Sequence, residues 1–186
     1  FDVDGISKSP SIFDEAKMRW LNGEYIKEMT PEKFVERARK FLDESAVAGK
    51  YDYLKVAKLL IPRVEILSEI PEKVECLRSF GKYDPTMFEH KKMKITMPLA
   101  LEVLQKRAAL LPSVDEWTDE SLKAALNALA EREGKKTGQI YLPLRLAITG
   151  AATTPGGATE MAELLGKEES LKRLDFSIDL LKEALE

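Results

Sequence analysis

The sequence predicts an all-α protein, and three observations carry that prediction. Apolar residues recur at helical spacing along nearly the whole chain, and no run shows the strict apolar–polar alternation of a strand. Threonine, proline and glycine stand where helices are expected to begin or end. Hydrophobic residues make up 44% of the 186 residues and charged residues 33%, which is a globular mixture. A chain of this size buries roughly 70% of the surface that it exposes when unfolded, so it can fold without disulfides or bound metal ions.

Capping residues and apolar stripes mark the helices of the first half. The pair Thr30-Pro31 is typical of an N-cap and a first helical position, and it opens a helix that we expect to end near Gly49. A second helix is predicted over about residues 53–61. Pro62 then either kinks this helix or restarts it over residues 63–67.

Aromatic and basic residues crowd together near the N-terminus, more densely than a plain helical bundle needs. One interpretation is a helix that ends at Asn22-Gly23, with Trp20 and Tyr25 as core aromatics. Lys17 and Arg19 would then be free to project outward.

The second half shows the clearest helical patterns. A helix is predicted over residues 97–111, and the segment 111–114 that follows it is the best candidate for a domain boundary. Thr118 can cap the next helix, and Gly134 suits the C-terminal end of that helix. A final helix with a heptad-like apolar stripe covers residues 171–185.

The charge distribution is more informative than the net charge of −3. Residues 135–159 contain no Asp or Glu, and their basic residues are Lys135, Lys136 and Arg145. A second basic stretch contains Lys82, Lys91, Lys92 and Lys94, with Arg107 further along. These stretches either face phosphate groups or are ordinary solvated surfaces, and the pattern alone leaves both open.

The residues give little support to catalysis. The single histidine, His90, lies in a polar stretch, and no glycine-rich phosphate loop or nucleophile motif is present. Cys76 is the only cysteine, so it has no partner for a disulfide and fits a semi-buried hydrophobe. No stretch reaches the 18 or so apolar residues of a membrane span, so we expect a soluble, cytoplasmic protein with no membrane contact.

Two blocks of residues resemble the C-terminal region of bacterial glutamyl-tRNA synthetases. The first block comprises Phe1-Asp2, Ile6 to Pro10, Phe13-Asp14, Lys17, Trp20 to Gly23 and Tyr25-Ile26. The second comprises Gly138 to Ile140, Pro143 to Arg145, Ala147, Thr149-Gly150, Thr154 to Gly156, Leu165 to Glu168 and Leu174. The blocks stand in the family's order, whereas the middle of the chain matches by helical character alone.

The resemblance implies the tRNA-reading part of a class I synthetase. It divides the chain into a stem-contact segment (1–28), a first anticodon-binding helical subdomain (29–111) and a second (112–186). It also implies a monomer that binds tRNA(Glu). The catalytic domain, with its ATP and Mg²⁺, would belong to the parent glutamate–tRNA ligase outside this chain, which would hold no cofactor and no catalytic residue itself.

The resemblance also implies a set of tRNA-binding residues. Lys17 and Arg19 would lie near the tRNA backbone, and Arg63 would be an arginine contributed by a helix of the first subdomain. The loop Thr154, Pro155 and Gly156 would offer free backbone N–H groups and a hydroxyl to a base. Arg145 would either pair with a phosphate or lie inside the bundle against a carboxylate.

A second hypothesis comes from a different class of protein. The chain would then be a free-standing helical interaction protein, derived from a synthetase, that binds protein partners through its apolar stripes. Salt-dependent binding of tRNA separates this hypothesis from the first.

Overall fold

The computed structural model describes residues 14–186, and no β-strand occurs among them. This confirms the all-α prediction. A single isolated bridge joins His90 to Ile95 within a series of short 3₁₀ turns. The helices are α1 (Glu15–Lys27), α2 (Pro31–Asp43), α3 (Tyr53–Leu60), α4 (Ile70–Lys73), α5 (Met97–Leu110), α6 (Asp119–Glu133), α7 (Thr137–Thr149), α8 (Ala158–Leu165) and α9 (Lys167–Leu185). The part of the resemblance between Phe1 and Phe13 lies outside the described residues.

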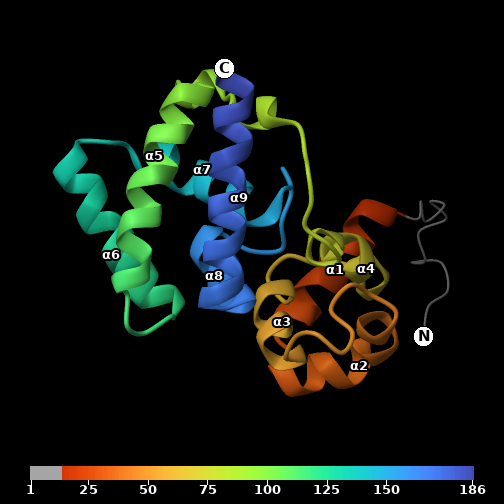
Figure 1. Cartoon of the computed structure of the whole chain (residues 1–186). Coiled ribbons are helices and arrows are strands. Elements are labelled where there is room, and N and C mark those ends of the chain that lie inside the picture. Colours follow the sequence, from red (N-terminus) through yellow and green to blue (C-terminus); the bar gives the residue numbers. More distant parts are fainter. Residues whose placement is uncertain (1–13) are drawn as a thin grey trace, which may run out of the picture.

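The helices form two groups, which lie side by side in Figure 1. In the first group, α2 packs against α3 and α4, with α1 beside them. In the second, α5 runs along α9, and α7 and α8 pack against each other and against α9. α5 thus packs with the helices that follow it, and the domain boundary at residues 111–112 stays a prediction. Direct contact between the groups is made by α3 and α8.

Local chemistry explains where the helices begin and end. The hydroxyl of Thr118 accepts a hydrogen bond from the backbone N–H of Ser121 at 3.3 Å, and Thr30 and Thr96 cap α2 and α5 in the same way. Gly134 ends α6 with a φ of 60°, a left-handed conformation that glycine adopts without strain. The caps predicted at Thr30, Thr118 and Gly134 are therefore confirmed.

Two local predictions about α1 were wrong. α1 continues through Asn22-Gly23 to Lys27, because Gly23 is buried against Glu65 inside the helix and does not end it. Trp20 and Tyr25 are 58% and 61% exposed, so they are not core aromatics. The buried residues of α1 are Gly23 and Ile26, and its aromatics point elsewhere.

The boundaries of α2 and α7 also differ from the predictions. α2 ends at Asp43, and turns carry the chain on to Gly49. α7 was not predicted as a helix, and it contains Pro143 in its interior. Proline in a helix interior removes one backbone hydrogen bond, which is why local pattern alone argues against a helix there.

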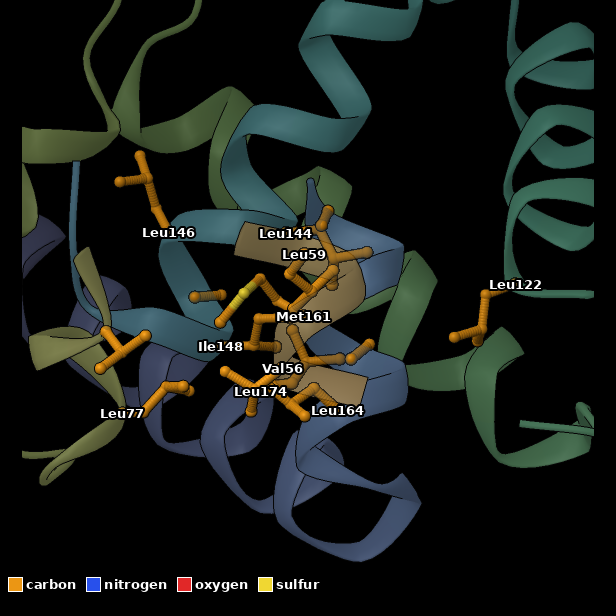
Figure 2. Close-up of a cluster of buried hydrophobic side chains, with 14 of the residues drawn as sticks. Val56, Leu59, Leu77, Leu122, Leu144, Leu146, Ile148, Met161, Leu164 and Leu174 are labelled. Atoms are coloured by element: carbon orange, nitrogen blue, oxygen red, sulfur yellow. The ribbon is translucent and has the colours of Figure 1, made fainter. Parts of the chain in front are cut away.

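One hydrophobic cluster runs through both groups of helices. Figure 2 shows Val56 and Leu59 of α3 among Met161 and Leu164 of α8, with Leu144 of α7 close by. Because these side chains are buried together, the first group cannot rotate on the second without exposing apolar surface. Among the described residues, no helix is both long and apolar enough to cross a bilayer.

Candidate nucleic-acid interface

Arg63 lies in the turn directly after α3, at the contact between the two groups of helices. Its Nη1 donates to the backbone oxygen of Leu59 at 2.8 Å, and its Nη2 donates to Oε2 of Glu160 at 2.8 Å. Arg63 was predicted on a helix, but Pro62 neither continues nor restarts α3, and the residues after it form a turn. The side chain is 35% exposed, so a ligand can reach it.

The loop before α8 is more enclosed than the sequence suggested. Pro155 and Gly156 are buried, and the hydroxyl of Thr154 donates to the backbone oxygen of Gly156 at 2.7 Å. The backbone N–H of Gly157 donates to Oε2 of Glu160 at 2.6 Å. The Thr154 hydroxyl proton and the Gly157 N–H are therefore not free for a base, because the tight turn into α8 uses them internally.

Glu160 joins these two predicted elements, and sequence reasoning missed it. The same carboxylate oxygen binds Arg63 of the first group and Gly157 of the second. We call Arg63, Glu160 and residues 154–157 the junction. A signal for Glu160 was present, because it stands three residues after the N-cap of α8, which is the spacing of a capping box.

Arg145 supports the backbone beside the junction. Its Nη2 donates to the backbone oxygen of Ala152 at 3.1 Å, in the connection between α7 and α8. No carboxylate pairs with it among residues 14–186. The interpretation that Arg145 lies against a carboxylate is wrong, and a phosphate contact stays a prediction.

The two basic residues predicted on α1 differ in their surroundings. Lys17 is exposed, whereas Arg19 forms ion pairs with Glu65 at 3.3 Å and with Glu69. The hydrogen bond that Arg19 donates to Glu69 raises the pKa of its guanidinium, aided by the charges of Glu69 and Glu65. Arg19 is therefore not free to project outward. Its pairing with Glu65 does place it beside the segment that follows Arg63.

The two basic stretches of the sequence meet at the start of α7. Lys92 and Lys94 from one stretch and Lys136 from the other line a cavity of about 440 Å³. The rest of its lining is Met93, Gly138 and Gln139, so no carboxylate takes part. We call this cavity the basic groove.

Contacts of Gly138 and Gln139 with Met93 hold the basic groove together. Nε2 of Gln139 donates to the backbone oxygen of Met93 at 3.1 Å. A Cβ atom at Gly138 would lie 3.0 Å from the sulfur of Met93, so glycine lets the two segments meet. α7 begins at Thr137, next to this groove, and the positive end of its helix dipole favours an anion there.

Other cations from the basic stretches are bound internally. Arg107 is fully buried and pairs with Glu133 at 3.0 Å, while Lys135 pairs with Glu102 at 3.0 Å. The idea that Arg107 extends a basic surface is therefore wrong. Burial explains this, because its apolar neighbours on α5 carry it into the core.

An all-α chain with an arginine at a junction of two helical groups and a separate carboxylate-free basic groove has the features of a helical module for nucleic acid. A family model described as an anticodon binding domain matches residues 33–178. The chain belongs to this family of anticodon-binding domains.

The curated relatives and solved structures agree on one type of protein. The chain is 38% identical over 188 residues to the glutamate–tRNA ligase of Clostridium novyi, covering all of this chain and 39% of that protein. It is 40% identical over 182 residues to the ligase of Clostridium tetani, covering 98% of this chain and 37% of that protein. A crystal structure of a glutamate tRNA ligase from Elizabethkingia meningosepticum matches with a TM-score of 0.76 and 25% identity, over 96% of this chain and 35% of that one. This chain thus spans less than two fifths of the proteins it matches.

Proposed function

We propose that this chain is the tRNA-reading part of a glutamate–tRNA ligase and that it holds the anticodon loop of tRNA(Glu). The observation that carries the proposal is the junction, where Glu160 links Arg63 of one helical group to the 154–157 loop of the other. Bases of an unstacked RNA loop are read by hydrogen bonds and by stacking on planar groups. A guanidinium that is one third exposed offers both.

The basic groove supplies the second part of the proposal. Lysines that neutralise phosphates strengthen binding without reading sequence, and they orient the RNA. Lys92, Lys94 and Lys136 converge without a carboxylate to compete for them. We expect them to contact the backbone of the bound tRNA, whereas Arg63 contacts a base.

The chemical step belongs to the parent protein. We propose that it attaches glutamate to tRNA at the expense of ATP, using Mg²⁺, in a domain outside this chain. Within this chain, we assign no residue to that step. Its contribution is selection of the tRNA.

Substitution of Arg63 tests whether the junction reads a base. We expect Arg63→Ala to weaken binding to tRNA(Glu) by about tenfold or more, on the order of 1–3 kcal/mol, and to weaken an anticodon-substituted tRNA much less. Fluorescence anisotropy with both tRNAs at fixed salt measures this difference. Equal weakening of both tRNAs would assign Arg63 to phosphate binding or to structure, and a wild-type chain without preference for tRNA(Glu) over unrelated RNA would overturn the proposed function.

Substitution of Lys136 tests the basic groove separately. We expect Lys136→Ala to weaken all RNAs alike and to make the plot of log binding constant against log salt concentration shallower by about 0.7–0.9, the value of one phosphate. Lys40→Ala on α2 is the matched control, since it also removes one exposed lysine. If both variants change the slope equally, the groove has no special role.

A further inference from the structure

One carboxylate oxygen connects the two helical groups at the junction. Oε2 of Glu160 accepts from Nη2 of Arg63 at 2.8 Å and from the N–H of Gly157 at 2.6 Å. Charge-assisted hydrogen bonds of this kind are about twice as strong as neutral ones. The position of the guanidinium is therefore linked to the position of the loop.

Packing leaves this arrangement little freedom. A Cβ atom at Gly156 would lie 3.2 Å from Cβ of Glu160, 3.3 Å from the sulfur of Met161 and 3.4 Å from Cδ2 of Leu59. The loop is thus in contact with both α3 and α8 at its most buried point. Arg63 is held at a second nitrogen by the backbone oxygen of Leu59. With two of its nitrogens bound, the guanidinium plane has one fixed orientation.

The ion pair also changes what Arg63 attracts. An unpaired arginine binds any phosphate, because the attraction is electrostatic and independent of sequence. Paired with Glu160, the guanidinium has little net charge to offer, but its planar face and remaining N–H groups stay available for a base. The carboxylate therefore favours base contacts over phosphate contacts.

We propose that Glu160 is a positioning residue that sets base selectivity at the junction. It keeps Arg63 from acting as a phosphate binder and aligns its guanidinium with the 154–157 loop. This inference rests on the proposed function, because it concerns how the same surface discriminates between RNAs. Glu160 acts through Arg63, so its effect requires that arginine.

Glu160→Gln tests the inference, because glutamine keeps the size and one acceptor for Gly157 while removing the charge. We expect unrelated RNA to bind about three- to fivefold more tightly, with the salt plot steeper by about 0.7–0.9, since Arg63 is released to one phosphate. Preference for tRNA(Glu) over an anticodon-substituted tRNA should fall by about tenfold. In the double variant Arg63→Ala/Glu160→Gln, the gain for unrelated RNA should disappear.

Two controls separate this role from a general loss of negative charge or of structure. Glu168→Gln removes one exposed carboxylate at the start of α9 and should leave the salt slope unchanged. If Glu160→Gln does not fold, Arg63→Lys tests the same point. A lysine can pair with Glu160, but it has no planar group that could donate to the backbone oxygen of Leu59 at the same time. The preference for tRNA(Glu) should therefore fall without a gain in binding of unrelated RNA.

The outcomes distinguish this inference from the proposed function. If the wild-type chain shows no preference for tRNA(Glu), both the proposed function and this inference are wrong. If Glu160→Gln keeps the wild-type preference for tRNA(Glu) and the wild-type salt slope, the proposed role of Glu160 is wrong while the proposed function stands. A gain for unrelated RNA that persists in the double variant also overturns it, because the effect would then not pass through Arg63.

Discussion

Two arginine–carboxylate pairs of the same local design lie in different surroundings. In each, Nη1 of the arginine donates to the backbone oxygen four residues earlier, and the guanidinium binds a glutamate of a helix that follows later in the chain. The Arg63–Glu160 pair is 35% and 28% exposed, whereas the Arg107–Glu133 pair is 0% and 10% exposed. Burial therefore decides what such a pair can do. Arg107 joins α5 to α6 out of reach of any ligand, whereas Arg63 is one third exposed and a ligand can reach it.

The buried pair depends strongly on its single carboxylate. Nε and Nη2 of Arg107 are buried and have no hydrogen-bond partner among the described residues. Desolvation of a charge is expensive, so an arginine in this position needs its counter-ion more than an exposed one does.

The largest expected effect on stability comes from breaking the buried ion pair between Arg107 and Glu133. Glu133→Gln leaves the charge of Arg107 buried without compensation, and we expect the free energy of unfolding to fall by about 3 kcal/mol. Arg107→Met should cost less than about 1.5 kcal/mol, because an apolar chain of similar volume suits the site and Glu133 keeps its ion pair with Lys106 at 3.3 Å. Urea unfolding of both variants measures the difference. If Arg107→Met is the more damaging change, the buried charge is not the reason that Glu133 matters.

A smaller effect is expected when the exposed pair is broken. Arg63→Ala should lower the free energy of unfolding by no more than about 1 kcal/mol, since exposed ion pairs contribute little. The same urea experiment checks this value. A loss as large as that of Glu133→Gln would make the junction a structural contact, and any loss of tRNA binding in Arg63→Ala would then have to be attributed to unfolding.

The sequence predicted helix ends well where a cap stands beside a clear apolar stripe. Thr30, Thr118 and Gly134 are such positions, and the structure confirms each. Prediction failed where tertiary contacts override local preference. α1 continues through Gly23, where Glu65, 42 positions later in the chain, packs against the glycine. The residues around Gly23 in the sequence give no sign of that contact.

The candidate site was predictable in part for the same reason. The resemblance pointed separately to Arg63 and to the loop Thr154 to Gly156, and Glu160 links the two segments in the structure. Glu160 was missed because its partner lies 97 positions away, and a glutamate in the first turn of a helix is ordinarily explained by the helix dipole. Arg107 was misplaced because the sequence shows its charge but not its burial.

The smallest expected effect concerns an exposed neighbour of the buried pair. Hydrogen bonds from Lys106 at 2.8 Å and Lys135 at 3.0 Å lower the pKa of Glu102 from 4.5 to about 2. A depressed carboxyl pKa stabilises the fold above the unfolded value, and that contribution is lost as the pH falls from about 4.5 to about 2. Because Glu102 is exposed, we expect wild type and Glu102→Gln to differ at pH 7 by less than about 1 kcal/mol. Urea unfolding from pH 7 to pH 2 should show this difference shrinking within that interval. If the difference in unfolding free energy stays constant down to pH 2, the charge of Glu102 does not contribute to stability. Lys106 would then stabilise the fold only through its ion pair with Glu133.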